Sequence, residues 1–148
     1  MAAKCFIDSG FLISAFDIAE PEKQEQAANL LNEIGTSGVG AVSTQIMAEF
    51  ADAITHNLIL SLDPDRTYQR VEELLGVWDV FVITPQVLLE AVRGMRDHNL
   101  AMRDGQVWAT AKANNISIVL TESIPNGTEI EGVRFLNPFQ AGFTLESI

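Results

Sequence analysis

The sequence has few of the residues that build disulfides or soft metal sites. Its 148 residues include one cysteine and two histidines. One cysteine cannot form an internal disulfide, and Cys5 lies in an apolar segment where a buried thiol is the usual outcome. His56 and His98 have no Cys or His at the spacing of a zinc site, so we expect both to be structural or exposed. These shortages argue against a disulfide scaffold and a zinc centre.

Long apolar runs and targeting segments are also missing. No run approaches the length that spans a membrane, and residues 1–5 have neither the basic start nor the long apolar core of a signal peptide. We therefore expect a cytoplasmic protein that does not bind membranes. Hydrophobic residues make up 47% of the chain and charged residues 20%, which is an ordinary globular balance. The length is most simply that of one domain, residues 1–148.

Basic residues are scarce. Nine Lys and Arg face 20 Asp and Glu, and the formal net charge is −11. Such a protein repels polyanions as a whole, which predicts weak binding to non-specific RNA or DNA. A nucleic-acid substrate is still compatible with this charge if a divalent metal ion neutralises an acidic centre. A glycine-rich phosphate loop is absent, because the segment 35–40 follows a predicted helix and lacks the lysine of a P-loop.

Short apolar strands alternate with amphipathic helices along the chain. Strands are predicted at about 4–7, 39–42, 77–84, 116–121 and 133–136. Helices are predicted at about 11–16, 20–34, 44–60, 63–76, 85–98 and 102–114. Continuously apolar strands are typical of parallel sheets that are covered on both faces. The fold class is therefore α/β, a single three-layer α/β/α domain with a central, mainly parallel sheet.

Two helices have apolar positions that we expect to face the core. In the helix at 63–76 these are Tyr68, Val71, Leu74 and Leu75. In the helix at 85–98 they are Val87, Leu88, Ala91, Val92 and Met95.

Asp8 stands at the end of the first strand. Ligands bind at the carboxyl ends of strands in open α/β sheets, so a carboxylate there is available for chemistry. The structural alternative is that Asp8 or Ser9 caps the helix that follows.

Two further acids fall on apolar helix faces. Glu49 is three residues after Ile46 and four before Ala53. Asp104 is four residues before Trp108 in the same way. The structural alternatives are that Glu49 pairs with an arginine or reaches solvent, and that Asp104 is an ordinary first-turn acid.

With right-handed crossovers, Asp8, Glu49 and Asp104 converge near the carboxyl ends of the strands. Converging carboxylates repel one another unless a hard cation neutralises them, and oxygen ligands suit Mg²⁺ or Mn²⁺. Such an ion activates water and stabilises charge on a phosphate. The sequence thus predicts a metal-assisted phosphoryl chemistry.

Four segments resemble the sequence blocks of PIN-domain proteins, and the likeness is greatest to VapC-type toxins of bacterial toxin-antitoxin pairs. The four segments are residues 6–13, 42–50, 102–111 and 118–123, and the ending 132–139 resembles one branch of that family. The resemblance covers nearly the whole chain and implies a PIN-like fold. It also implies a metal-dependent endoribonuclease in which Asp8, Glu49 and Asp104 hold Mg²⁺ or Mn²⁺.

The resemblance carries further expectations about the site and the partners. The fourth block commonly has an acid where this chain has Ser123, which leaves open whether one or two ions bind. Thr121, Ser123, Ser9 and Arg103 are the expected supporting or phosphate-contacting groups, and Arg93 and Arg96 are further candidates for phosphate. The structural alternative for the three arginines is that they are ordinary solvated helix charges. The implied partners are an RNA substrate, a cognate antitoxin with a basic segment and a second copy of the chain in a homodimer.

Two alternatives belong to other functional classes. A PIN-like module that has lost catalysis and acts through a protein partner fits Ser123 and the acidity of the chain. Phosphoryl transfer with Asp8 as the covalent nucleophile is disfavoured, because Gly10 stands where a second Asp is usual and no Lys follows the strand at 116–121.

Overall fold

Five short parallel strands form the centre of the molecule. The structure is a computed structural model that describes residues 3–148. The parallel strands are β1 (Cys5–Ile7), β2 (Gly40–Ser43), β3 (Asp79–Phe81), β4 (Ile118–Leu120) and β6 (Val133–Leu136). A sixth strand, β5 (Glu129–Ile130), runs antiparallel to β6. The strand order is β3-β2-β1-β4-β6-β5, so β1 and β4 are central neighbours and pair from Cys5 with Ile118 to Ile7 with Leu120.

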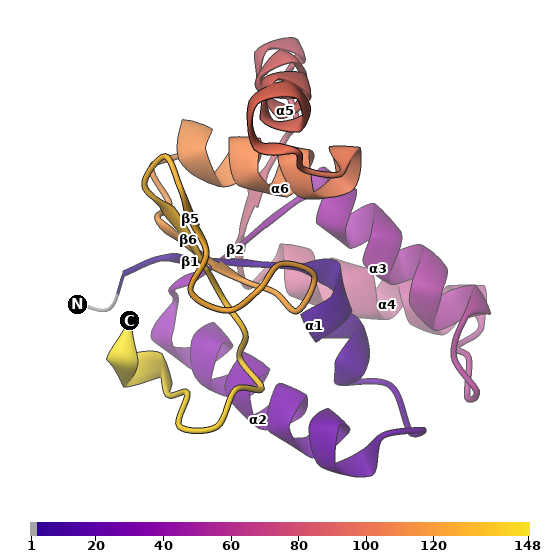
Figure 1. The fold of residues 1–148 in the computed structure, drawn as a ribbon. Helices are drawn as coiled ribbons and strands as arrows, with labels where there is room; N and C mark the ends of the chain where they lie inside the picture. The colour runs from indigo at the N-terminus through magenta and orange to yellow at the C-terminus, as the bar shows by residue number, and fades with distance from the viewer. Residues whose placement is uncertain (1–2) are drawn as a thin grey trace.

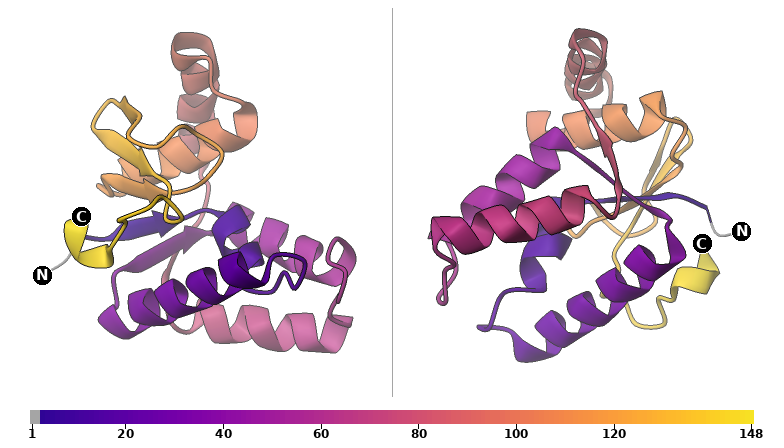
Figure 2. Two further views of the ribbon diagram at one scale, coloured as in Figure 1. Left: turned by 60° about the horizontal axis from the view of Figure 1, so that its bottom comes forward. Right: turned by 180° about the vertical axis from the view of Figure 1, so that it is seen from behind.

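Helices cover both faces of the sheet. They are α1 (Ser9–Ser14), α2 (Pro21–Ser37), α3 (Thr44–His56), α4 (Pro64–Leu75), α5 (Pro85–His98) and α6 (Met102–Ala113), with a final 3₁₀ turn η1 (Leu145–Ser147). Helix α6, with α5 packed against it, lies on the opposite side of the sheet from α2 (Figure 1, Figure 2). This arrangement confirms the three-layer α/β/α fold with a mainly parallel sheet. In the part of the chain that the structure describes, no helix combines the length and apolarity needed to cross a bilayer.

The helix boundaries follow from local chemistry. The side chains of Ser43, Asp63 and Thr84 accept hydrogen bonds from backbone N–H groups in the first turns of α3, α4 and α5. Proline stands in the first turn of α2, α4 and α5, where its missing N–H costs nothing. Helix α2 runs past Gly35 to Ser37 and is capped by Gly38, which adopts the left-handed conformation with φ 73°.

The core lies between the sheet and the two helical layers. Its largest fully buried side chains include Trp108, Phe6, Phe11, Phe50 and Phe135. Cys5 is fully buried in β1, and Trp78 is 7% exposed. The prediction of a buried thiol is confirmed, and both tryptophans belong to the core.

The apolar face predicted for α5 is wrong in part. Val87 and Ala91 face inward as predicted, and Gly94 shares their line. Leu88, Val92 and Met95 are 45%, 47% and 42% exposed. The reason is the close approach of α5 and α6, since a Cβ on Gly94 would lie 2.9 Å from the Trp108 ring. At Gly94 the inner line therefore has no room for a side chain, and the larger Leu88, Val92 and Met95 lie outside that line.

The face predicted for α4 is also wrong in part, because Tyr68 is 70% exposed and Leu75 45%. The helix presents Thr67 to α3 instead, and the hydroxyl oxygens of Thr67 and Thr55 lie 2.7 Å apart. Strand β3 and helix α3 are shorter than predicted, and β5 was not predicted. Strand β3 is at the edge of the sheet and pairs with β2 over three residues, so apolar residues beyond it lie in loops.

Candidate active site

Asp8 lies at the carboxyl end of β1, beside the end of β4. Its backbone N–H donates to the carbonyl of Leu120 at 3.1 Å, and its side chain is 5% exposed. One carboxylate oxygen accepts from the backbone N–H of Ser9 at 2.7 Å, so Asp8 does cap α1. The other oxygen accepts from the hydroxyl of Thr121 at 2.5 Å. The capping alternative is therefore true, and it leaves Asp8 free to contact other groups at the same edge of the sheet.

Glu49 and Asp104 reach the same point from two helices. Glu49 is in the second turn of α3 and Asp104 is in the first turn of α6, with side chains 32% and 17% exposed. Both helices begin beside the carboxyl ends of parallel strands, which is why the three acids meet. The three acids thus lie together in the structure, as the sequence predicted.

Arg103 is the group on which the three acids converge. Its Nε lies 2.9 Å from Oε2 of Glu49, and its Nη1 donates to Oδ1 of Asp104 at 3.1 Å. Its Nη2 donates to Oδ1 of Asp8 and also to the hydroxyl of Ser9, the latter at 2.7 Å. One guanidinium thus contacts an oxygen of each acid. For Glu49, the structural alternative of pairing with an arginine is therefore what the structure shows.

The charge of Arg103 is strongly favoured in this position. Burial by itself lowers the pKa of Arg103, but the hydrogen bond and charge of Asp8, together with the charge of Glu49, raise that pKa well above its ordinary value. Three carboxylates and one guanidinium leave the cluster with a formal charge of −2. The site therefore still attracts cations.

Two hydroxyls at the end of β4 orient the acids. Thr121 donates to Asp8, and Ser123 donates to Oδ1 of Asp104 at 2.9 Å. The backbone N–H of Ser123 donates to the Thr121 hydroxyl at 3.0 Å, which fixes the turn after the strand. Thr121 and Ser123 therefore hold two of the three carboxylates in place.

A pocket of about 400 Å³ opens beside the acids. It is lined by Asp8, Ser9, Gly10, Ala101, Arg103, Asp104, Glu122 and Ser123. Glu122 does not join the cluster, because its carboxylate pairs with Lys23 on α2, with 2.8 Å between Nζ and Oε2. Glu122 therefore does not take the place of a fourth acid in the cluster.

The donor set is suited to a hard divalent ion, since carboxylate and hydroxyl oxygens are the ligands of Mg²⁺ and Mn²⁺. As the side chains stand, residues 3–148 contain no group of three or more His, Cys, Asp or Glu placed to hold a metal. The reason is that Asp8, Glu49 and Asp104 are spaced around the Arg103 guanidinium. The side chains are of the chemical kind that binds a metal ion, but their spacing in this structure matches a guanidinium.

Arg93 and Arg96 do not reach the acids through the contacts that the structure records for them. Arg93 pairs with Glu90, Asp97 and Glu131, and Arg96 pairs with Asp97. These ion pairs lie on α5 and at the turn between β5 and β6. His98 joins the same group, with 2.5 Å between its Nε2 and Glu131, whereas His56 is exposed. Both histidines thus have the structural or exposed positions that the sequence predicted.

Gln45 is a residue of the site that the sequence reasoning missed. Its Nε2 donates to the backbone carbonyl of Arg103 at 3.3 Å and so ties α3 to the start of α6. The available signal was its position four residues before Glu49, on the same helix face. Lys23 was also missed, and its contact with Glu122 had no signal in local spacing.

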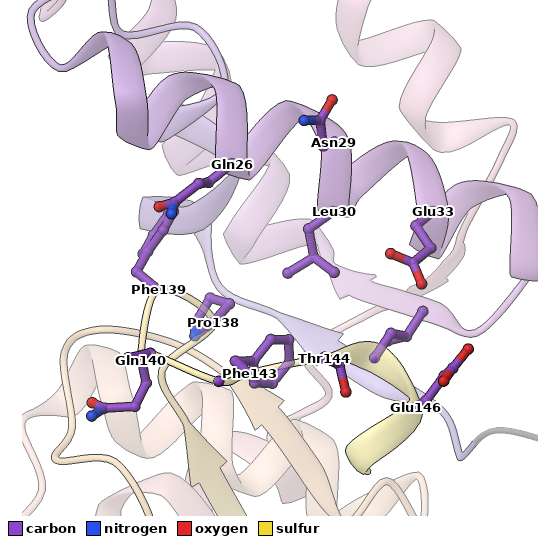
Figure 3. Close-up of a pocket in the computed structure, with 13 residues that line it drawn as sticks. Gln26, Asn29, Leu30, Glu33, Pro138, Phe139, Gln140, Phe143, Thr144 and Glu146 are labelled. Carbon is purple, nitrogen blue, oxygen red and sulfur yellow. The ribbon is translucent and has the colours of Figure 1, made fainter.

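A separate pocket of about 550 Å³ lies between α2 and the C-terminal segment. Leu30 points from α2 towards the tail, where Pro138, Phe139 and Phe143 lie (Figure 3). The residues that line this pocket include none of the three converging acids. The Phe139 ring packs edge-on against Phe11 of α1, with 5.5 Å between ring centres. We interpret this region as the packing of the tail onto the domain.

Comparison with protein families finds a match to the PIN domain over residues 5–122, which is well over half of the chain. No curated protein sequence matches the chain. Several solved structures have the same fold. A toxin-antitoxin complex from Klebsiella pneumoniae has a TM-score of 0.68 at 17% identity, over 92% of this chain and 98% of that one.

Two further structures show the same likeness. The DNA-bound VapBC of Salmonella typhimurium has a TM-score of 0.65 at 16% identity, over 92% of this chain and 98% of that one. The toxin VapC20 of Mycobacterium tuberculosis, described as cleaving the sarcin-ricin loop, has a TM-score of 0.60 at 13% identity, over 78% and 87%. At these identities the likeness shows a shared fold.

Proposed function

The chain belongs to the PIN domain family, and we propose that it is a metal-dependent endoribonuclease, the toxin of a bacterial toxin-antitoxin pair. The observation that carries this proposal is the convergence of Asp8, Glu49 and Asp104 from three elements on one cation. The fold shared with a toxin described as cleaving the sarcin-ricin loop and with toxin-antitoxin complexes supports it. The VapC-type assignment rests on that fold and on the four sequence blocks.

Asp8, Glu49 and Asp104 would hold Mg²⁺ or Mn²⁺. When bound, such an ion would supply positive charge to a phosphodiester and would lower the pKa of a water molecule, the chemistry that phosphodiester hydrolysis at neutral pH needs. Thr121 keeps the Asp8 carboxylate oriented through its 2.5 Å hydrogen bond, and Ser123 does the same for Asp104. Ser9 and Arg103 stand at the same pocket and are the groups available to a phosphate.

The direct test is RNA cleavage by the purified protein with Mn²⁺, Mg²⁺ or EDTA. Asp8→Asn and Glu49→Gln are expected to abolish cleavage and calorimetric Mn²⁺ binding, because each removes a ligand charge. Glu122→Gln is the matched control, since this acid lines the same pocket but pairs with Lys23. Cleavage that survives Asp8→Asn or EDTA would overturn the proposal.

A second candidate is a PIN-like binding module with weakened catalysis. Ser123 in place of an acid, and the partial neutralisation of the acids by Arg103, favour it. The same assay decides between the two. Mn²⁺-stimulated cleavage that is lost with EDTA and in Glu49→Gln excludes the binding module, and the absence of cleavage on any RNA supports it.

A cognate antitoxin is the proposed protein partner. The net charge of −11 suits a basic segment, and the contacts of Arg103 demonstrate that a guanidinium fits among the three acids. A basic peptide of the antitoxin would bind there by the same charge-assisted hydrogen bonds. Co-purification of the toxin with the product of a neighbouring gene, weakened by Glu49→Gln, is the expected result.

A homodimer is the second proposed assembly. Leu88, Leu89, Val92 and Met95 form an exposed apolar face on α5, and Leu89 is 73% exposed. In the proposed dimer, two copies pack through α5 and bury this face. Light scattering should report a dimer that Leu89→Lys converts to a monomer. Leu60→Lys, at a 64% exposed leucine outside α5, should leave the dimer intact.

A further inference from the structure

The cluster of acids already contains a cation from its own chain. Arg103 contacts Glu49 through Nε, Asp104 through Nη1, and Asp8 through Nη2. All three nitrogens of the guanidinium are therefore used, and Nη1 and Nη2 each contact two of the acids, because Nη1 also donates to Asp8 at 3.3 Å and Nη2 to Glu49 at 3.2 Å. No other arginine in the described residues is recorded with partners that include these three acids.

A guanidinium and a divalent ion cannot share these oxygens. Mg²⁺ or Ca²⁺ draws its oxygen ligands to about 2.0 to 2.6 Å, so carboxylates that bind one ion approach one another closely. The planar guanidinium holds them apart, because each acid meets a different edge of the plane. This spacing agrees with the lack of a metal-ready group in residues 3–148. The two cations must alternate in the site.

The side chain of Arg103 can leave without unfolding the helix that carries it. Its backbone carbonyl accepts from Gln45, which holds the start of α6, while its side chain is 34% exposed. A long side chain on a fixed helix turn reaches solvent by changing its rotamers. The pocket beside it, which Gly10 and Ala101 help to line, is the space into which a displaced guanidinium would turn.

We infer that Arg103 competes with the divalent ion for Asp8, Glu49 and Asp104, and that metal binding turns its guanidinium outward to meet the RNA phosphate. Arg103 thereby neutralises part of the charge of the three acids before the metal binds and provides the pocket with positive charge afterwards. This inference rests on the proposed function, because it needs the same acids to bind the metal. In a chain with a net charge of −11, a basic side chain in the pocket is a substantial aid to binding RNA.

The first experiment measures the dissociation constant of Mn²⁺ by calorimetry for the full chain and for Arg103→Met. The variant is expected to bind Mn²⁺ about tenfold more tightly, because the ion no longer displaces a charge-assisted hydrogen-bonded group. Arg70→Met is the control with the same loss of charge, since Arg70 pairs with Glu73 on α4. Equal affinities in wild type and Arg103→Met would overturn the inference.

A second experiment distinguishes occupation of the site by a guanidinium from simple charge repulsion between Arg103 and the metal ion. Methylguanidinium chloride is titrated into Arg103→Ala, with tetramethylammonium chloride at the same ionic strength as the comparison. Methylguanidinium should refill the space between the acids and weaken Mn²⁺ binding, whereas tetramethylammonium, which cannot donate hydrogen bonds, should not. Equal effects of the two salts would overturn the occupancy of the site by Arg103.

A third measurement tests the outward role. Fluorescence anisotropy with a 2′-O-methyl RNA oligonucleotide, which resists cleavage, should show weaker binding by Arg103→Met than by wild type or Arg70→Met in Mn²⁺. Equal RNA binding by all three proteins would overturn that role. If Asp8→Asn abolishes Mn²⁺ binding while Arg103→Met leaves it unchanged, the proposed function stands and this inference fails. If neither the wild type nor Arg103→Met binds Mn²⁺, the proposed function and this inference both fail.

Discussion

Ser123 donates a hydrogen bond to Asp104, with 2.9 Å between its Oγ and the carboxylate Oδ1. This serine stands where the PIN blocks described above commonly carry an acid. Its hydroxyl therefore supports an existing carboxylate and adds no charge of its own. Among the residues that contact Arg103, the negative charge comes from three acids: Asp8 directly after β1, Glu49 on α3 and Asp104 on α6.

Ser123→Asp should increase the number of Mn²⁺ ions bound by one protein chain from one to two. The added carboxylate lies beside Asp104, and two acids at this distance repel each other unless a second cation binds. Calorimetry gives the stoichiometry directly. Ser123→Asn is the uncharged control and should leave one site. A stoichiometry of one in Ser123→Asp would show that the side-chain charge at this position does not decide the number of ions.

Gly105→Ala should destabilise the fold. A Cβ on Gly105 would lie 2.8 Å from the backbone carbonyl oxygen of Ala91, so α5 and α6 would have to separate. Overpacking of this kind costs about 1–3 kcal/mol in the free energy of unfolding. Urea denaturation measures it.

Gly10→Ala is the matched control for Gly105→Ala. Gly10 is also helical, and its Cβ would meet no atom within 4 Å. The higher helix propensity of alanine should leave stability unchanged or raise it by up to about 1 kcal/mol. Similar losses in both variants would contradict the packing explanation.

The stabilising effect of Glu131 should disappear in acid. Hydrogen bonds from Arg93, followed by those from His98 and Lys112, lower the pKa of Glu131 from 4.5 to about 2. A carboxyl with a depressed folded-state pKa stabilises the fold above its unfolded pKa, and this contribution is lost as pH falls from 4.5 towards 2. Wild type should therefore have a higher Tm than Glu131→Gln at neutral pH.

The Tm difference between wild type and Glu131→Gln is expected to shrink over that acidic interval and to fall with added salt, because the ion pairs face solvent. Glu129→Gln, two residues earlier in the same hairpin, is the control. A Tm difference that is the same at neutral and acidic pH would mean that Glu131 acts through its backbone conformation, which has φ 48°, and not through its charge.

The thiol of Cys5 should be unreactive in the folded protein. Cys5 is fully buried in β1, and burial raises the pKa of its thiol from 9.0 to about 11. Reaction with Ellman's reagent at mildly alkaline pH should be slow and should follow the unfolding transition in urea. The same shift means that the fold loses stability as pH rises from 9 towards 11, because the unfolded thiol releases its proton first. Immediate reaction of the native protein would contradict the burial of β1.

The sequence by itself determined the fold class and the three acids. The alternation of apolar strands and helices predicted the layers, and caps such as Ser43, Asp63 and Thr84 determined where helices begin. Asp8, at a strand end, and Glu49, on an apolar helix face, were visible because these positions depend on neighbours within four residues. Local spacing is therefore enough to choose candidate acids.

Only the tertiary structure decided what those acids contact. Arg103 directly precedes Asp104, yet it also pairs with Asp8 and Glu49, which are far away in the chain. The line along which α5 meets α6, at Gly94 and Gly105, likewise became known only from the tertiary structure. Contacts of this kind are set by the packing of elements in space, and the spacing of residues within one element does not contain that information.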